Sequence, residues 1–259
     1  RIVATPFDYR GERYCVFAVS EISHEKRRRA LERSFFHDLL NTAGGLSGLL
    51  EALAIEAPED LRPDLEIAQM GFRDMVDQIQ TQRDLSRAES DELRPAPSRL
   101  ASLRILRDVI ALFENHPLAA ERTLVLDKSA VDQEFVSDRT LLGRVLVNLV
   151  KNALEACPPA GAVRLGCART KGGLGFWVRN PGAIPRAVQL QIFNRSFSTK
   201  GDGRGLGTYA VKLLTEKYLG GSVGFSSSPE AETTFHVTLP LAPASDQDGE
   251  MASSRSGTP

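Results

Sequence analysis

Residues 148–156 read Asn148-Leu149-Val150-Lys151-Asn152-Ala153-Leu154-Glu155-Ala156. This stretch lies inside a helical pattern that Asp138 is placed to cap and that ends at Pro158-Pro159. Residues four apart share a helix face, so Asn148 and Asn152 project together. An amide oxygen is a hard ligand that suits Mg²⁺. Two solvated asparagines would give the same pattern, so this interpretation depends on the rest of the chain.

The segments around this helix predict a mixed α/β domain, because strand-like and helix-like patterns follow one another. In chain order we expect a helix at 100–114, a strand at 122–127, the capped helix up to Cys157, strands at 162–169 and 173–180, a helix up to Tyr218, and strands at 222–227 and 233–239.

A glycine-rich loop spans Lys200 to Gly207 and runs directly into a predicted helix. Its glycines let the backbone approach phosphates, and the helix start offers free N–H groups and the positive end of a dipole. Lys200 and Arg204 supply the positive charge that a triphosphate needs. The loop is not a Walker A loop, because it does not end in Gly-Lys-Ser/Thr. Its glycine spacing also does not fit that of a Rossmann loop.

The first third of the chain predicts a helical hairpin. The helix expected from about Ser23 to Ala57 carries an apolar stripe, formed by two series of residues that recur every seven positions. The first series is Phe35, Thr42 and Leu49, and the second is Leu39, Leu46 and Leu53. Pro58 and Pro63 should separate it from a second amphipathic helix. One partner helix cannot bury the apolar stripe of the first helix or that of the second. We therefore expect a homodimer that forms a four-helix bundle.

Within the first of these helices stands the sequence Ser34-Phe35-Phe36-His37-Asp38-Leu39-Leu40-Asn41-Thr42. His37 and Asn41 share a face, whereas Asp38 points about 100° away. A contact between Asp38 and the His37 ring therefore requires a favourable rotamer. Alone, the motif would be interpreted as a solvated histidine.

Composition, charge and the proline-bearing linker indicate the class of the protein and its division into parts. The 42% hydrophobic content suits a folded protein, and the net charge of −1 gives no argument for nucleic acid or for contact of this fragment with a membrane. The three cysteines lack metal-ligand spacing and are typical of reduced thiols, which predicts a cytoplasmic location. The start at Arg1 predicts a fragment of a longer protein. We expect parts at 1–22, 23–94 and 95–242, divided at the proline-bearing linker 94–98, and a disordered tail at 243–259.

Several motifs resemble, in their order, those of sensor histidine kinases. Residues 148–153 resemble the N box, 178–185 the G1 box, 193–200 the F box, 203–207 the G2 box, 233–235 the last glycine box, and 36–41 the H box. The strand exit and linker at 19–27 resemble the end of a PAS sensor domain, so residues 1–22 would be its remnant. The resemblance implies an α+β protein: the helical hairpin, followed by an α/β sandwich of the Bergerat (GHKL) ATPase type.

The resemblance also implies a chemistry. His37 would take the γ-phosphoryl group of ATP and pass it to an aspartate in the receiver domain of a response regulator. Asp38 would orient the ring or take its proton, and Asn41 would position a water that dephosphorylates the regulator. Asn148 would assist polarisation, and Asn152 would chelate Mg²⁺. The implied nucleotide-binding set is Asn152, Lys151, Asn180, Gly182, Phe193, Phe197, Lys200, Gly203, Arg204, Gly205, Leu206, Gly207 and Thr234.

Two departures from the family pattern leave alternatives open. Asn180 stands where an aspartate usually accepts a hydrogen bond from adenine, in a turn one residue short, and Glu232 replaces a glycine. An amide oxygen accepts without charge assistance, which predicts weaker binding. A nucleotide-binding pseudokinase scaffold is one alternative. A clamp-type ATPase is another, although Asn148 occupies the place of the glutamate that activates water there.

Overall fold

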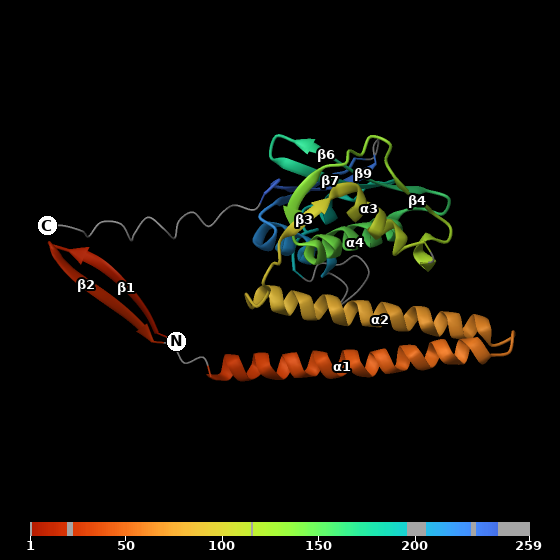
Figure 1. Cartoon of the computed structure of the whole chain (residues 1–259), viewed down its shortest axis with the longest axis horizontal. Coiled ribbons are helices and arrows are strands. Elements are labelled where there is room, and N and C mark those ends of the chain that lie inside the picture. Colours follow the sequence, from red (N-terminus) through yellow and green to blue (C-terminus); the bar gives the residue numbers. More distant parts are fainter. Residues whose placement is uncertain (1, 20–22, 115, 196–205, 229–231, 243–259) are drawn as a thin grey trace. The chain divides into compact units, whose positions relative to one another are not determined.

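The computed structural model describes residues 2–19, 23–114, 116–195, 206–228 and 232–242 (Figure 1). The chain forms two compact units, Arg1–Arg83 and Asp84–Pro259. The predicted disordered tail and most of the predicted glycine-rich loop lie outside the described residues.

The first unit begins with a β-hairpin. Strands β1 (Ile2–Tyr9) and β2 (Glu12–Val19) pair antiparallel, with Tyr9 opposite Glu12. The two residues between them, Arg10 and Gly11, have φ of 52° and 81°, as a type I′ turn requires. The origin of this hairpin in a PAS-like domain stays a prediction.

Two long helices follow, α1 (Ser23–Glu56) and α2 (Arg62–Glu89). The side-chain amide of Gln69 donates to the Leu50 carbonyl at 3.0 Å and joins them, as the predicted hairpin requires. The prediction that Pro63 separates the helices is wrong. Pro63 lies in the first turn of α2, where its missing N–H costs no helical hydrogen bond. No helix among the described segments is long and apolar enough to cross a bilayer.

The predicted stripe of α1 is largely uncovered in the single chain. Phe35, Leu49 and Leu53 are 60%, 61% and 58% exposed, and among the residues of this helix whose burial is described only Ala43 is buried. A monomeric protein seldom exposes so many large apolar side chains on one helix. The prediction of a dimeric four-helix bundle rests on this unburied surface and stays a prediction.

The second unit is a two-layer α/β structure (Figure 1). Its sheet has the order β4-β6-β7-β9-β8, with β4 parallel to β6 and the other pairs antiparallel. The strands are β4 (Thr123–Leu126), β6 (Ala162–Thr170), β7 (Gly173–Asn180), β8 (Ser222–Ser226) and β9 (Thr233–Leu239). The helices are α3 (Ser102–Ala111), α4 (Arg139–Ala156), the short α5 (Arg186–Gln189) and α6 (Gly207–Leu213), with a 3₁₀ turn η1 (Pro117–Ala119) and a π-helical turn η2 (Leu214–Tyr218).

Helix α4 packs against one face of this sheet and against α3 and α6. Its Leu142, Leu146 and Val150 are fully buried, and so is Phe176 of β7. The alternate residues of β7, Trp177 and Arg179, lie on the other face, where the Arg179 guanidinium is 5.1 Å from the centre of the Trp177 ring. The predicted capped helix and the predicted strands of this unit are confirmed, within one or two residues.

One part of the second unit differs from the prediction. The helix expected from Leu100 begins at Ser102, because residues Ser98–Ala101 form strand β3. This strand pairs with β5 (Glu134–Ser137) in a separate two-stranded sheet. Both strands have four residues, too few for a periodic pattern to stand out.

The two cysteines of the second unit are structural. Burial raises the pKa of both thiols, and the Sγ atom of Cys167 donates to the Val131 carbonyl at 3.1 Å. A buried thiol with a raised pKa is unreactive.

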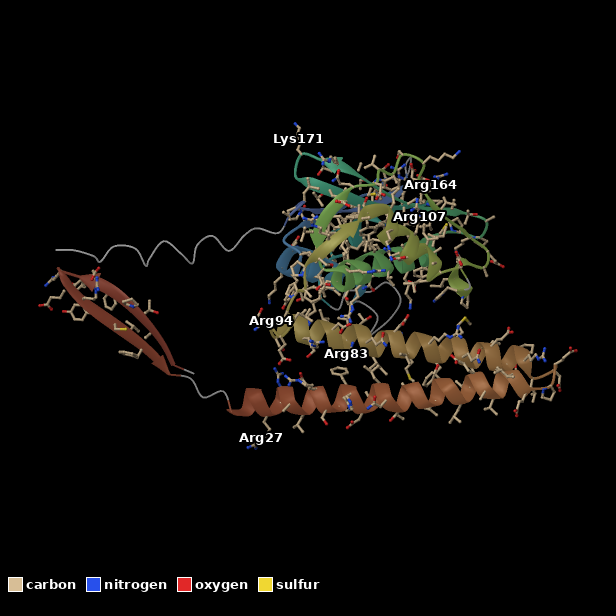
Figure 2. The ribbon with its side chains drawn as sticks, viewed as in Figure 1. Arg27, Arg83, Arg94, Arg107, Arg164 and Lys171 are labelled. Atoms are coloured by element: carbon tan, nitrogen blue, oxygen red, sulfur yellow. The ribbon has the colours of Figure 1, made fainter. Side chains whose placement is uncertain are left out.

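The end of α2 belongs to the second unit. Leu85 and Ala88 are 2% and 0% exposed, and the Tyr218 hydroxyl donates to the Ala88 carbonyl at 2.5 Å. Three ion pairs add to this packing: Asp84–Arg144 at 2.7 Å, Glu89–Arg195 at 2.9 Å and Asp91–Lys217 at 2.6 Å. Arg94, labelled in Figure 2, follows this segment and donates to the Asp91 carbonyl at 2.8 Å. We call residues 84–94 the α2 clasp.

The first prediction concerns this clasp. Leu85→Ala should lower the free energy of unfolding of the second unit by about 2–5 kcal/mol, because it removes a buried side chain and leaves a cavity. Trp177 is the only tryptophan of the chain, so urea unfolding followed by its fluorescence reports on this unit. The matched control Leu112→Ala, at a side chain 66% exposed, should cost no more than about 0.5 kcal/mol. Equal effects of the two variants would show that the clasp is not packed on the domain in solution.

Candidate active site

The predicted phosphoacceptor lies on α1 with its imidazole exposed. The side chains of His37 and Asp38 are 71% and 74% exposed, and Nδ1 of His37 lies 3.2 Å from Oδ1 of Asp38. The adjacent acid therefore reaches the ring through its rotamer, as predicted. The Thr42 hydroxyl donates to the Asp38 carbonyl at 2.9 Å, one turn further along the same helix.

This contact decides the tautomer of the ring. A carboxylate only accepts hydrogen bonds, so Nδ1 of His37 carries the proton and donates it to Asp38. In the neutral imidazole, Nε2 is then the nitrogen with a free lone pair. The arrangement leaves Nε2 as the ring nitrogen that can accept a hydrogen bond.

Asn41 lies beside the same ring. Its Nδ2 is 3.2 Å from Nδ1 and 3.3 Å from Nε2 of His37, as expected for two residues four apart. With Nδ1 protonated, only Nε2 can accept a hydrogen bond from this amide. The Asn41 amide therefore lies at the lone pair of Nε2.

Helix α4 positions the two asparagines from which the sequence analysis began. The Asp138 carboxylate accepts from the Leu141 amide at 2.9 Å and caps the helix, as predicted. A Cβ atom built on Gly207 would lie 3.6 Å from Oδ1 of Asn148 and 3.7 Å from Nδ2 of Asn152. The start of α6 thus faces both asparagines at van der Waals distance. Lys151 is half-buried beside Asn152.

The environment of Asn152 fits a bound nucleotide and its metal ion. Among the described residues, the Nδ2 atom of Asn152 is buried without a hydrogen-bond partner. An unpaired buried donor costs about 1–3 kcal/mol, so a ligand oxygen at this place would be stabilising. The described part of the chain holds no cluster of three carboxylates, histidines or cysteines that could bind a metal by itself.

A turn after β7 holds the residue that departs from the family pattern. Asn180 is 3% exposed, and its Nδ2 donates to the Pro181 carbonyl at 2.7 Å. Gly182, with φ of 95°, follows in a conformation that favours glycine. The Thr233 hydroxyl, which lies opposite Asn180 in the β7–β9 register, donates to the Gly182 carbonyl at 2.8 Å.

The structure brings Thr233, and not the predicted Thr234, to this turn. Thr234 lies on the other face of the sheet, where its hydroxyl accepts from the Arg179 guanidinium at 3.2 Å. Successive strand residues point to opposite faces, so one position decides the difference. The alternation of β9 could have identified Thr233 in the sequence, because Phe235 is a core residue of the same strand. Ser227, whose Oγ lies 2.8 Å from Thr233 Oγ1, carried no recognisable signal.

The two ends of the glycine-rich loop are fixed near one another. Phe193 packs on Phe225 and Phe235 with ring centres 5.9 and 6.3 Å apart, so its described contacts are structural. The Thr208 hydroxyl donates to the Ile192 carbonyl. The loop residues predicted to bind nucleotide between these ends, namely Phe197, Lys200, Gly203, Arg204 and Gly205, lie outside the described residues, whereas Leu206 and Gly207 are described at the start of α6.

Helix α6 also contacts the α2 clasp near this site. Burial, and then the Glu89 carboxylate, raise the pKa of Tyr209, so its hydroxyl stays protonated and donates to Glu89. Arg144 pairs with Asp84 and stands one helical turn before Asn148 on the same face of α4. The clasp therefore lies beside α4, one turn before Asn148, and beside α6 at Tyr209.

The second prediction tests the hydroxyl at the turn. Thr233→Val keeps the shape of the side chain but leaves the Gly182 carbonyl without its donor, so unfolding of the second unit should become easier by about 1–3 kcal/mol. Thr238→Val, on the outer face of the same strand, serves as the control and should change stability little. Urea titration monitored by Trp177 fluorescence measures both. Identical midpoints for the two variants would mean that the Thr233 hydroxyl does not hold the turn.

Comparisons with known proteins agree with this geometry. Residues 137–243 match the family described as histidine kinase-, DNA gyrase B-, and HSP90-like ATPase. The sensor protein DivL of Caulobacter vibrioides is 29% identical over 230 residues, which cover 86% of this chain and 27% of DivL. The chain spans between 26% and 33% of the length of the first curated relatives that it matches.

Two solved histidine kinase structures are also similar to this chain. The catalytic domain of histidine kinase ThkA is 27% identical, with a TM-score of 0.51, over 57% of this chain and 99% of that chain. Full-length ShkA, solved in complex with AMPPNP, matches with a TM-score of 0.66 over 83% of this chain and 46% of that chain; at 21% identity it shows the likeness of fold alone. Residues 137–243 therefore form a domain of the histidine kinase-, DNA gyrase B-, and HSP90-like ATPase family, and over most of its length the chain is similar to sensor histidine kinases.

Proposed function

We propose that the chain phosphorylates itself on His37 with ATP and then transfers the phosphoryl group to an aspartate in the receiver domain of a response regulator. The observation that carries the proposal is the 3.2 Å contact between Nδ1 of His37 and Oδ1 of Asp38 on an exposed helix face. This contact leaves Nε2 as the unprotonated ring nitrogen, and the Asn41 amide, 3.3 Å from it, would have to turn aside for Nε2 to act as a nucleophile. A solvated histidine without a chemical role has no need of such a partner.

The chemical step follows from the tautomer. The lone pair of Nε2 attacks the γ-phosphorus, the bond from that phosphorus to the β–γ bridging oxygen breaks, and ADP leaves with the electron pair. The ring gains positive charge as the N–P bond forms. Asp38 stabilises this charge through the Nδ1–H hydrogen bond and can accept that proton. The reaction therefore needs no separate base to deprotonate the nucleophile.

The second unit would hold the co-substrate. Asn152 would bind Mg²⁺ through its amide oxygen and, with Asn148, face the phosphates beside Gly207. When bound, the metal ion neutralises charge on the transferring phosphoryl group. Asn180 would meet the adenine edge at the end of β7. Lys200 and Arg204 would contribute positive charge from the glycine-rich loop.

Asn41 fits a second activity, removal of the phosphoryl group from the regulator. Its amide is next to the Nε2 lone pair, so in the unphosphorylated ring it is placed where a water or an incoming phosphoryl group would be. Asn41 would orient a water toward the regulator's phosphoaspartate. Homodimers would form through the uncovered stripe of α1.

The third prediction tests the kinase proposal with [γ-³²P]ATP. We expect label on the protein in an acid-labile, base-stable form, which is typical of phosphohistidine. His37→Gln should abolish the label because it removes the nucleophile, and Asn152→Ala should reduce it by at least about a hundredfold if the metal ligand is lost. His236→Gln, at an exposed histidine of β9, is the matched control and should keep full labelling.

The outcomes separate the alternatives. Label that persists in His37→Gln would disprove the assignment of the phosphoacceptor. Nucleotide binding without any label would favour the pseudokinase scaffold. Release of inorganic phosphate without label, unaffected by His37→Gln, would favour a clamp-type ATPase, although Asn148 stands in place of the glutamate that such enzymes use.

A further inference from the structure

The start of helix α6 is attached to the rest of the second unit through three consecutive residues. Gly207 faces the two asparagines of α4. The Thr208 hydroxyl donates to the Ile192 carbonyl, and the Tyr209 hydroxyl donates to the Glu89 carboxylate of the α2 clasp. Successive helix residues point about 100° apart, so these contacts lie around the helix. Together they fix its rotation and its distance from the asparagines.

Glu89 also contacts the segment on the other side of the glycine-rich loop. Its Oε2 atom accepts from the Arg195 guanidinium at 2.9 Å, in an ion pair whose carboxylate side chain is only 27% exposed. The described residues end at Arg195 and resume at Leu206, so Arg195 and Tyr209 flank the loop on its two sides. One carboxylate of α2 thus contacts both ends of the glycine-rich loop.

A carboxylate suits this place because both of its oxygens accept hydrogen bonds, so that it can serve two donors at once. An amide has a single acceptor oxygen, and its NH₂ group would face a donor. The helix itself does not favour the residue, since Glu89 ends α2, where the negative end of the helix dipole disfavours a carboxylate. The favourable interactions of Glu89 are therefore with Arg195 and Tyr209 and not with its own helix.

We propose that Glu89 is a positioning residue of the nucleotide site. By holding Arg195 and Tyr209, it keeps Gly207 beside the asparagines of α4 and keeps the two ends of the glycine-rich loop together. The inference rests on the proposed nucleotide site and deepens it, because it adds a residue from the helical hairpin. The motifs of the nucleotide site all follow the linker at 94–98, whereas Glu89 precedes it.

The effect of such a contact is pre-organisation. Bringing the ends of a loop together costs conformational entropy, and a contact that already holds them removes this cost from ligand binding. Glu89 does not touch the nucleotide in this arrangement, so its loss should weaken binding and leave the rate at saturating ATP unchanged. Coupling between two sites is reciprocal, so a bound nucleotide should in turn stabilise the contacts of the α2 clasp.

The experiment measures the binding of ADP with Mg²⁺ to the full chain by titration calorimetry. Glu89→Gln keeps the size of the side chain but leaves one of its two donors without an acceptor. We therefore expect binding about three- to tenfold weaker than in wild type. Asp91→Asn is the matched control, because it makes the same change at an exposed ion pair of the clasp and should keep the wild-type affinity. Asparagine also tolerates the φ of 58° at this position.

Two further measurements distinguish positioning from a general effect on folding. In labelling with [γ-³²P]ATP, Glu89→Gln should raise the ATP concentration that gives the half-maximal rate by the same factor as it weakens ADP binding. The maximal rate should stay within about twofold of wild type. Addition of ADP should slow hydrogen exchange of the backbone amides at residues 84–94 in wild type, and this protection should be smaller in Glu89→Gln.

A double variant shows whether Glu89 acts through its two partners. Tyr209→Phe and Arg195→Met each remove one of the donors, and together they remove both. In that background Glu89→Gln should have no further effect on the affinity for ADP, since the groups that it holds are no longer there.

An ADP affinity of Glu89→Gln equal to that of wild type, or an equal loss of affinity in Asp91→Asn, would overturn the inference. A full effect of Glu89→Gln in the double variant would do the same, as would a lower maximal labelling rate at an unchanged ATP requirement. Failure of wild type to bind ADP would overturn both the inference and the proposed nucleotide site. Wild type that binds ADP but takes up no label at His37 would overturn the kinase proposal alone.

Discussion

Burial of one face of α4 against the sheet is the constraint on which the candidate nucleotide site depends. Leu142, Leu146 and Leu149 must face the core, and this fixes the rotation of the helix about its axis. Asn148 and Asn152 are therefore turned toward Gly207 by the hydrophobic side of the same helix. Asp138 fixes the start of α4 as well, since its two carboxylate oxygens accept from Leu141 and from Ala96 in the linker. The polar site is a consequence of apolar packing.

The same helix connects the site to the α2 clasp. Arg144 stands one turn before Asn148 and pairs with Asp84, whose side chain is only 10% exposed. Breaking such a pair leaves a charge poorly solvated and is costly, whereas the exposed Asp91–Lys217 pair contributes little. Helix α2 thus continues from the first unit into the packing of the second. This continuity explains why the proline-bearing linker at 94–98 does not coincide with the edge of the compact second unit.

The elements with a strong period could be predicted from the sequence. The α4 helix with its cap, the five-strand pattern and the long helix of His37 all have the lengths and spacings that periodicity detects. Strands β3 and β5 could not be predicted, because four residues contain too little periodicity and their pairing is long-range. The motif match selected Thr234 and not Thr233 because it does not take into account which face of the strand a residue lies on. Ser227 lies in a loop after β8, and its role depends entirely on what the fold brings beside it.

The contacts that decide the chemistry at both sites join neighbours in the sequence. His37 meets Asp38 and Asn180 meets Pro181, although adjacent residues do not share a face in helix or strand. Periodicity describes the directions of Cβ atoms, and a rotamer can carry the far end of a side chain to the group beside it. At both sites the neighbour can only accept a hydrogen bond, so it fixes where the proton or donor of the reactive side chain goes. On the other side of each group an acceptor atom remains, which is Nε2 in His37 and Oδ1 in Asn180. The sequence contains both pairs, but only side-chain geometry shows that each neighbour sets the direction in which the functional group acts.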